Sequence, residues 1–300
     1  MSHENNSLVI GSDSLLGRTL LARLTESGDA VWGTSRRESA GGPRRVRLDL
    51  SATTPKLFLP QPVHSAFVCA SVTAMRACEA QPAETKRVNV TNTLRIVEQL
   101  LERGTFVQYL SSSAVFDGTQ AFPREHEPGC ATTEYGRQKA EVEARLLELD
   151  GGRGQIAICR LSKVIAHGVP AIARIVQALE AGSRIEAFSD LALSPVSVSY
   201  AVDSLLAVAR RRLGGIFHFS GETELTYADL ARTLAGHLWA AESLVTAVTA
   251  ADRGIVPLFR PVHPALGMAG TTARLGILPQ TLDRAIASLV HERYREAAQA

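Results

Sequence analysis

The feature that most constrains the fold of this chain is an alternation of short apolar runs with longer helical patterns through its first half. Segments of strand length and segments of helical periodicity follow one another at Ser7–Gly11, Leu15–Ser27, Ala30–Thr34, Val46–Leu48, Ser65–Cys69, Pro82–Gly104, Phe106–Ser111, Tyr135–Leu149 and Gln155–Leu161. Strands that are separated by helices run parallel, and their carboxyl ends meet at one edge of the sheet. The sequence therefore predicts an α/β fold with a doubly wound parallel sheet and ligand binding at that edge.

The second half of the chain has a different pattern, with irregular pieces that are richer in Pro and Gly. A chain of 300 residues is long enough for one large α/β domain and a smaller lobe. The predicted domains are a Rossmann-type domain at residues 1–165, to which residues 193–215 return, and a smaller C-terminal substrate-binding lobe at residues 166–192 and 216–300. The cleft between the two is the predicted site.

The composition argues against several classes of partner. The net charge is only +2 and no apolar run approaches transmembrane length, so neither nucleic acid nor a membrane is expected as the main partner. The polar start, Met1–Ser7, lacks the pattern of a secretory signal. The four cysteines, at positions 69, 78, 130 and 159, are widely spaced and have no His at zinc-ligand spacing. We expect no metal site, reduced thiols and a cytoplasmic location, with a homodimer left open.

The first predicted strand runs directly into the loop Gly11-Ser12-Asp13-Ser14-Leu15-Leu16-Gly17, and the first helix begins inside this loop. Glycine lets the backbone turn tightly, and the N–H groups of a helix N-terminus attract phosphate. The loop therefore predicts a cradle for the pyrophosphate of a dinucleotide, formed by Gly11, Ser14, Leu15, Leu16 and Gly17. Ser14 stands where the usual motif has its middle glycine, and a plain strand-to-helix turn is the alternative.

The end of the second strand indicates which dinucleotide is bound. An acidic side chain at this place would hold the ribose of NAD. The chain instead has Ser35-Arg36-Arg37, and two guanidinium groups favour the 2′-phosphate of NADP(H) through charge-assisted hydrogen bonds. A solvated basic loop, or a Glu38 that turns inward, is the alternative.

Two further strand ends supply predicted cofactor contacts. Asp49 and Leu50 follow the third strand, where Asp49 could accept a hydrogen bond from the adenine amino group. Cys69, Ala70 and Ser71 end the fourth strand, and their small side chains leave room for the middle of the cofactor. These assignments rest on position alone; Asp49 as a loop cap and Cys69-Ala70 as plain packing are the alternatives.

A tyrosine and a lysine stand four residues apart, as Tyr135 and Lys139, at the start of a predicted helix. This spacing puts both side chains on one helix face. A neighbouring ammonium lowers the pKa of a phenol, which brings proton transfer near neutral pH into range. The serines 111–113 at the end of the fifth strand supply a hydroxyl that can hold the substrate oxygen. Together, these serines, Tyr135 and Lys139 predict a Ser/Tyr/Lys site for carbonyl chemistry. The alternative is an exposed Tyr/Lys pair on a helix surface.

With these motifs the chain resembles the extended short-chain dehydrogenase/reductase superfamily, and within it dTDP-4-dehydrorhamnose reductase and related nucleotide-sugar enzymes. The resemblance covers nearly the whole chain and is strongest from Tyr109 to Gly118. Further matching stretches are Val88–Thr91, Tyr135–Lys139, Ile158–Ser162, Ser194–Val196 and Gly215–Gly221. The resemblance implies Ser112 as the catalytic hydroxyl, Tyr135 as the proton donor, and Lys139 as the residue that holds the nicotinamide ribose and tunes the tyrosine.

The resemblance also implies where substrate and cofactor lie. The residues it adds are Asn89, Tyr135 and Lys139 as cofactor contacts and Ser113, Lys163 and Ser194 as substrate contacts. Ser113-Ala114 stands in place of the Asp-Tyr pair of the rhamnose reductases, and Lys163 in place of their Trp. These departures put a rhamnose precursor in doubt as the substrate; Lys163 could meet an anionic group or stay in solvent.

The predicted function is NADPH-dependent reduction of a carbonyl group on a nucleotide-linked sugar or a similar polar metabolite. Hydride moves to the carbonyl carbon while Tyr135 protonates the developing alkoxide and Ser112 orients it. One alternative is an epimerase or dehydratase of the same superfamily that retains NAD, against which Arg36 and Arg37 argue. Another is a non-catalytic NADP-binding regulatory subunit, whose mark would be a broken Tyr/Lys pair.

Overall fold

The computed structural model describes residues 6–37 and 44–299, with side chains described to residue 292. The chain divides into two compact units. Unit 1 comprises Met1–Val115, Pro128–Arg160 and Val202–Phe217, and unit 2 comprises Phe116–Glu127, Leu161–Ala201 and His218–Ala300. Each unit has its own apolar core.

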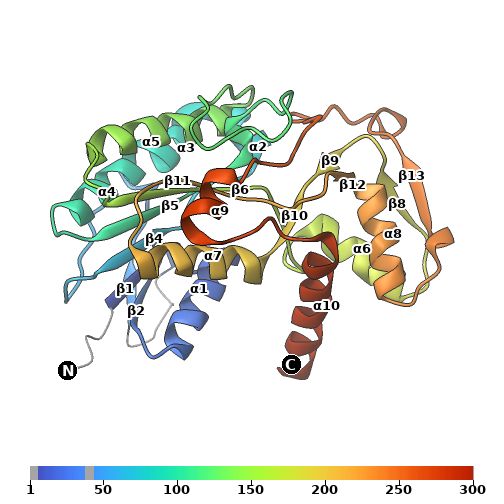
Figure 1. Ribbon diagram of the computed structural model, residues 1–300, viewed down its shortest axis with the longest axis horizontal. Coiled ribbons are helices and arrows are strands. Elements are labelled where there is room, and N and C mark those ends of the chain that lie inside the picture. Colours follow the sequence, from blue (N-terminus) through green and yellow to red (C-terminus); the bar gives the residue numbers. More distant parts are fainter. Residues whose placement is uncertain (1–5, 38–43, 300) are drawn as a thin grey trace. The chain divides into compact units, whose positions relative to one another are not determined.

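A seven-stranded sheet forms the centre of unit 1, in the strand order β11-β6-β5-β4-β1-β2-β3 (Figure 1). Its strands are β1 (Asn6–Ile10), β2 (Ala30–Ser35), β3 (Arg45–Arg47), β4 (Ser65–Val68), β5 (Phe106–Ser112), β6 (Ile156–Leu161) and β11 (Gly215–Phe219). The pairs β1–β2, β1–β4, β2–β3 and β4–β5 are all parallel. The chain order reverses between β1 and β4, the place where such sheets bind ligands. The predicted doubly wound parallel sheet is confirmed.

Helices cover both faces of this sheet. They are α1 (Leu15–Glu26), α2 (Met75–Ala80), α3 (Pro82–Lys86), the π-helical η1 (Arg87–Asn92), α4 (Thr93–Leu101), the short 3₁₀ helix η2 (Ser113–Val115), α5 (Glu134–Asp150) and α7 (Val198–Arg211). Figure 1 shows α3, α4 and α5 over one face and α1 and α7 over the other. The single helix predicted over residues 82–104 is interrupted, because η1 widens the helical turn between α3 and α4.

The strands of unit 1 form because their apolar side chains can be buried on both sides of the sheet. Leu8 in β1, Val107 in β5 and Ile158 in β6 are buried in one continuous core. Val97 of α4 and Val142 of α5 pack into the same core. Burying a side chain of this size contributes about 1.5–3 kcal/mol, so the sheet and its helices stabilise each other.

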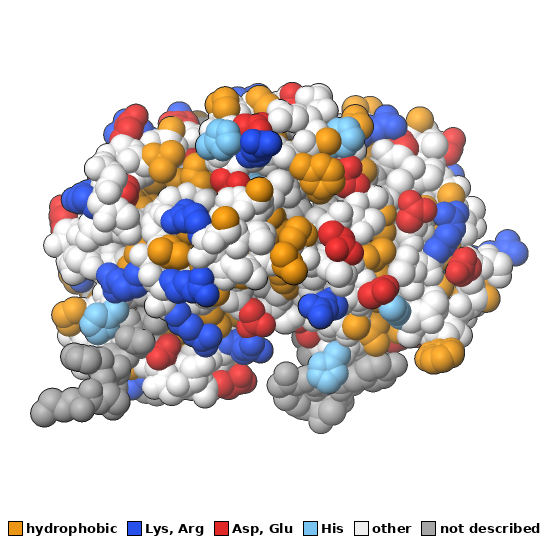
Figure 2. Space-filling view, viewed as in Figure 1, with side chains coloured by type: hydrophobic (Ala, Val, Ile, Leu, Met, Phe, Trp, Pro, Cys, Tyr) orange, Lys and Arg blue, Asp and Glu red, His pale blue; other side chains and the backbone are white. Residues whose placement is uncertain are grey.

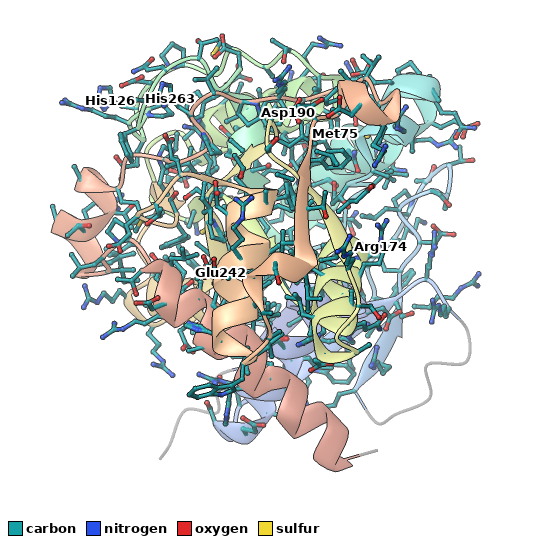
Figure 3. The ribbon with its side chains drawn as sticks, turned by 90° about the vertical axis from the view of Figure 1, so that its right-hand side faces the viewer. Met75, His126, Arg174, Asp190, Glu242 and His263 are labelled. Atoms are coloured by element: carbon teal, nitrogen blue, oxygen red, sulfur yellow. The ribbon has the colours of Figure 1, made fainter. Side chains whose placement is uncertain are left out.

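Unit 2 contains short strand pairs and helices. Its elements are β7 (Lys163–Ile165), α6 (Pro170–Glu180), β8 (Ile185–Phe188), β9 (Ala192–Leu193), β10 (Pro195–Ser197), β12 (Leu225–Thr226), α8 (Tyr227–His237), η3 (Glu242–Leu244), β13 (Val245–Val248), η4 (Ala251–Arg253), α9 (Ala269–Leu275) and α10 (Leu282–Gln299). β7–β10 and β8–β13 pair in parallel, and β9–β12 is antiparallel. Ile172, Leu234 and Leu289 bring α6, α8 and α10 into one core. Asp190, labelled in Figure 3, joins the turn after β8 to Ala250, whose N–H it accepts at 2.9 Å.

The predicted domain boundaries and the observed units differ at two segments. Phe116–Glu127 belongs to unit 2, and the returning segment begins at Val202 rather than at residue 193. Glu125 explains the first difference, because its carboxylate accepts hydrogen bonds from the N–H and hydroxyl of Thr271 at 2.7 and 2.8 Å. These partners are 146 residues apart in the sequence, so no local sequence pattern predicts the contact.

Charged side chains of both signs are distributed over the face in Figure 2, in keeping with a net charge of +2. Among the residues that the structure describes, no helix is both long and apolar enough to cross a membrane. The four cysteines all lie in the described part of the chain, and none forms a disulfide. Within those same residues, His, Cys, Asp and Glu do not gather in threes or more at a place that could hold a metal ion.

Candidate active site

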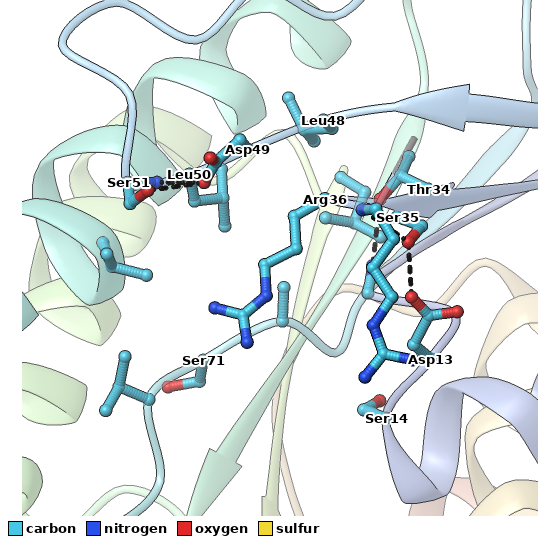
Figure 4. A pocket seen from close by; sticks show the side chains of 16 residues that line it. Asp13, Ser14, Thr34, Ser35, Arg36, Leu48, Asp49, Leu50, Ser51 and Ser71 are labelled. Carbon is cyan, nitrogen blue, oxygen red and sulfur yellow. Dashed lines mark hydrogen bonds between the residues drawn. The ribbon is translucent and has the colours of Figure 1, made fainter. Parts of the chain in front are cut away.

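A cavity of about 490 Å³ opens at the carboxyl ends of β1, β2 and β4 in unit 1 (Figure 4). The predicted cofactor contacts that line it are Gly11, Ser14, Ser35, Arg36, Arg37, Asp49, Leu50, Ala70 and Ser71. The lining residues that the sequence reasoning missed are Ile10, Asp13, Thr34, Leu48, Ser51, Val72 and Val88. The cavity therefore lies at the sheet edge where ligands bind in folds of this type.

The turn between β1 and α1 depends on close backbone contacts. Gly11 has a φ of 81°, and a Cβ added to it would lie 2.8 Å from Ala70. A Cβ added to Gly17 would lie 2.3 Å from the carbonyl oxygen of Gly11. Ser14 has a φ of −72°, which any residue can adopt, and its hydroxyl accepts a hydrogen bond from the Gly17 N–H at 3.1 Å. The two outer positions thus require glycine, whereas Ser14 serves as the N-cap of α1.

The end of β2 brings charges of both signs to the cavity. Figure 4 shows the Arg36 side chain extending into it, and both Arg36 and Arg37 are exposed. Near them the Asp13 carboxylate accepts hydrogen bonds from the Ser35 hydroxyl and, at 3.0 Å, from Arg45 Nη1. The hydrogen bond from Ser35, with help from Arg45, holds the pKa of Asp13 below its usual value. Asp13 therefore carries a fixed negative charge at the cavity. Its position two residues after Gly11 was the sequence feature that could have identified it as a lining residue.

Asp49 closes the turn that follows β3. Its Oδ1 accepts hydrogen bonds from the N–H and the hydroxyl of Ser51 at 2.8 and 2.7 Å. These bonds hold the pKa of Asp49 below its usual value. Asp49 therefore acts as a loop cap while it also lines the cavity. Glu38, the alternative to the arginines at the end of β2, lies outside the described residues.

Asn89 acts on the cavity through the loop that follows β4. Its amide oxygen accepts hydrogen bonds from the Val72 N–H at 2.7 Å and from the Ser71 hydroxyl at 3.0 Å. Its amide nitrogen donates to Gln138 Oε1 at 2.8 Å, which joins the loop to α5. At the start of the same loop, burial raises the pKa of the Cys69 thiol to about 12. The buried side chain of Asn89 thus positions residues that line the cavity.

Tyr135 and Lys139 lie on one face of α5, and Ser112 ends β5. The Tyr135 side chain is 7% exposed, and its hydroxyl is hydrogen-bonded to Ser112. Lys139 is 3% exposed and donates from Nζ to the carbonyl oxygen of Leu110 at 2.8 Å. Its Nζ lies 5.8 Å from the centroid of the Tyr135 ring. The three predicted catalytic side chains therefore meet at the end of β5 within unit 1.

Burial sets the protonation of the tyrosine and the lysine. It raises the pKa of Tyr135, although the hydrogen bond with Ser112 acts in the opposite direction. It lowers the pKa of Lys139 to about 8, against the effect of the Glu143 charge. The expectation that the pKa of the phenol is lowered is therefore wrong for this structure, because the loss of solvation outweighs the other effects. A neutral phenol is nevertheless the form that can donate a proton.

The three consecutive serines have different environments. Ser111 donates its hydroxyl hydrogen bond to the Glu143 carboxylate. Ser112 is bonded to Tyr135, and Ser113 begins η2 with its side chain half-buried. Ser112 is thus the serine whose hydroxyl meets the phenol.

The predicted substrate contacts are divided between the units. Lys163 begins β7 in unit 2 and is exposed. Ser194, also in unit 2, is fully buried, and its hydroxyl donates to the carbonyl oxygen of Gly221 at 3.0 Å. Ser113 belongs to unit 1. The structure therefore does not bring these three side chains together within one unit, and Ser194 is engaged in the packing of unit 2.

Nearly the whole chain matches a known protein family. Residues 5–295 match the model of the RmlD substrate binding domain family, and the chain belongs to that family. The resemblance to dTDP-4-dehydrorhamnose reductase and its relatives, inferred from the motifs around Ser112 and Tyr135, is confirmed by this match.

Individual relatives are distant but align over most of their length. The chain is 25% identical to a Haloferax volcanii protein named probable low-salt glycan biosynthesis reductase Agl14, over 94% of this chain and 96% of that one. It is 26% identical to methionine adenosyltransferase 2 subunit beta of Xenopus tropicalis, over 87% of this chain and 79% of that one. It is also 26% identical to dTDP-4-keto-6-deoxy-D-glucose reductase of Streptomyces niveus, over 87% of this chain and 88% of that one.

Solved structures share the fold. The dTDP-4-dehydrorhamnose reductase of Bacillus anthracis in complex with NADP superposes with a TM-score of 0.81 at 16% identity, over 97% of this chain and 99% of that one. MoeE5 in complex with UDP-glucose and NAD superposes with a TM-score of 0.77 at 21% identity, over 97% of this chain and 99% of that one. At these identities the likeness establishes the architecture alone.

Proposed function

We propose that the chain reduces a carbonyl group on a nucleotide-linked sugar, with NADPH as the hydride donor and Ser112, Tyr135 and Lys139 as the catalytic residues. One observation carries the proposal: the buried side chains of Tyr135 and Lys139 meet the Ser112 hydroxyl at the carboxyl end of β5, in the unit that holds the cavity. The names of two relatives, both reductases, support the reaction class. We assign the reaction to the cytoplasm, in keeping with cysteines that form no disulfide.

The residues of the cavity fit a nicotinamide dinucleotide. The N-terminus of α1 offers N–H groups and a partial positive charge to a pyrophosphate, and Gly11 lets the backbone approach it closely. Arg36 and Arg37 would hold a 2′-phosphate. Lys139, whose Nζ lies 2.8 Å from the carbonyl oxygen of Leu110 in β5, would hold the second ribose. When bound, the cofactor supplies the hydride that the carbonyl carbon accepts.

The catalytic side chains handle the proton of this reaction. Tyr135 donates its phenolic proton to the carbonyl oxygen as that oxygen gains negative charge, so that the product is an alcohol. Ser112 donates a hydrogen bond to the same oxygen and orients it. Lys139 stabilises the phenolate that remains, because it is protonated below a pKa of about 8. The burial of Tyr135 and Lys139 excludes water from the proton transfer.

An assay of NADPH oxidation tests the proposal directly. The protein should oxidise NADPH in the presence of a nucleotide-linked 4-keto-6-deoxysugar and form the corresponding alcohol. Tight binding of NADPH without oxidation, across a panel of nucleotide-linked keto sugars, would contradict the proposal and support a non-catalytic subunit.

Turnover should decline as the pH rises through about 8. The pKa of Lys139 is lowered by burial to about 8, so the ammonium is present below that pH and is lost above it. A neutral amine no longer stabilises the phenolate of Tyr135, and kcat falls. The measurement is kcat at saturating substrate across the neutral and alkaline range. A kcat that stays constant up to about pH 10, where an ordinary tyrosine titrates, would contradict this role of Lys139.

Replacing both Arg36 and Arg37 by Ala should weaken the use of NADPH selectively. A hydrogen bond to a charged group contributes about 1.5–3 kcal/mol, so KM for NADPH should rise on the order of 10- to 100-fold. KM for NADH should stay close to that of the wild type, because NADH has no 2′-phosphate. Arg103→Ala is the matched control, since Arg103 is exposed in the turn after α4 and does not line the cavity. Equal changes for both cofactors would contradict the assignment.

Two observations favour other candidates. Several relatives are named methionine adenosyltransferase 2 subunit beta, which favours a regulatory subunit, although this chain keeps both Tyr135 and Lys139. The Asp13 carboxylate lines the cavity beside Ser35 and could accept a hydrogen bond from a free ribose hydroxyl, which favours NAD. NAD that stays bound to the purified protein after desalting would support an epimerase or dehydratase.

A further inference from the structure

A buried ion pair lies one helical turn beyond Lys139. Glu143 of α5 is 4% exposed and Arg160 of β6 is 3% exposed. The Arg160 Nε lies 3.1 and 3.0 Å from the two carboxylate oxygens, and its Nη2 lies 2.6 Å from Oε2. Charged residues are almost never buried to this extent unless they are paired. The geometry therefore fixes the Glu143 carboxylate in a single position.

The same carboxylate reaches the strand that carries the catalytic hydroxyl. Ser111 donates its hydroxyl hydrogen bond to Glu143 Oε1, and Ser111 directly precedes Ser112 in β5. Along α5, Tyr135, Lys139 and Glu143 recur at a spacing of four and are all buried, so they occupy one face of the helix. Glu143 thus connects the helix that carries the proton donor to the strand end that orients the substrate oxygen.

We propose that Glu143 is a positioning residue of the candidate catalytic site. Its carboxylate, held by Arg160, keeps Lys139 charged and holds the end of β5 against α5. The inference rests on the proposed function, because it concerns the same site. A lysine without a nearby negative charge would lose its proton in so dry an environment. In agreement, the charge of Glu143 raises the pKa of Lys139 against the larger effect of burial.

Other titratable groups also face Lys139, and they come from several elements. They are Tyr135 on α5, Tyr109 on β5, Cys69 after β4 and Cys78 on α2; Arg160 on β6 is paired with Glu143. Burial raises the pKa of both phenols and both thiols, so these four groups are neutral near pH 7. Among these neighbours, Glu143 is the group that presents a negative charge to the ammonium.

A lysine titration by NMR tests the inference without substrate or cofactor. The chain has four lysines, at positions 56, 86, 139 and 163, and Lys139→Arg identifies the signal of Lys139. In Glu143→Gln the titration midpoint of Lys139 should fall by about one pH unit or more. Glu141→Gln is the matched control, because Glu141 lies on the same helix in a half-exposed pair with Lys86, and the midpoint should not move. An unchanged midpoint in folded Glu143→Gln would overturn the proposal.

Two further variants keep the test decisive. Glu143→Gln leaves Arg160 buried without its anion, so a variant with both Glu143→Met and Arg160→Met serves if the single variant does not fold. The Lys139 midpoint should fall in this variant as well, and a wild-type midpoint would overturn the proposal. Glu143→Asp keeps the charge, so its midpoint should stay near that of the wild type while kcat falls through the lost contact with Ser111. Because the titration needs no substrate, failure of the proposed reductase activity would leave its result intact.

Discussion

Tyr135→Phe should abolish most turnover while NADPH binding stays close to that of the wild type. The substitution removes only the phenolic oxygen, which is hydrogen-bonded to Ser112, and the ring keeps its buried place on α5. General acid catalysis by a positioned side chain contributes about 10²–10⁴-fold, so kcat should fall on the order of 1000-fold. The measurements are kcat with a confirmed substrate and the Kd for NADPH.

Tyr109→Phe is the matched control for this prediction. The Tyr109 hydroxyl is buried in β5, and within the described residues it has no hydrogen-bond partner. Lys139 Nζ lies 4.5 Å from the centroid of the Tyr109 ring, a contact that phenylalanine keeps. Turnover should therefore be retained and the free energy of unfolding should rise, since an unsatisfied buried hydroxyl costs about 1–3 kcal/mol. Normal turnover in Tyr135→Phe would show that a different group donates the proton.

The sequence could predict those parts of the candidate site whose signals are local. In the turn between β1 and α1, Gly11 has a positive φ and Gly17 lies against the carbonyl oxygen of Gly11. Tyr135 and Lys139 need only helical spacing to share a face. The alternation of strands and helices then places the serines 111–113 at the same sheet edge as the loop. Each of these inferences depends on a few neighbouring residues and on the strand order.

The parts that could not be predicted depend on which polar side chains turn inward. Asp13 is joined to Arg45, which is 32 residues further along the chain. Glu141 and Glu143 are two positions apart, yet one is paired with Lys86 on the surface and the other is buried with Arg160. The only local indication that Glu143 is buried was its position four residues after Lys139, which places both side chains on one face of the helix. The raised pKa of Tyr135 could not be predicted either, because the neighbouring residues in the sequence do not indicate how deeply the side chain is buried.

Gly136→Ala should destabilise unit 1, which is the reverse of what this change does in an ordinary helix. Alanine is favoured over glycine in a helix interior by about 1 kcal/mol. At Gly136, however, a Cβ would lie 2.0 Å from the carbonyl oxygen of Ala114 and 2.9 Å from the Cβ of Ala131. The closer contact is with backbone, so the start of α5 must move away from η2. We expect the free energy of unfolding to fall by about 1–3 kcal/mol.

The same displacement should reduce turnover, because Gly136 directly follows Tyr135. Moving the start of α5 away from η2 separates the phenol from Ser112, and a misplacement of about 1 Å costs on the order of 100-fold in rate. Gly236→Ala in α8 is the control: in the described part of the chain nothing lies within 4 Å of its added Cβ, so Tm should rise. Thermal unfolding and kcat check both variants. If Gly136→Ala gained stability as Gly236→Ala does and kept its turnover, the close approach of α5 to Ala114 would play no part in holding Tyr135 against Ser112.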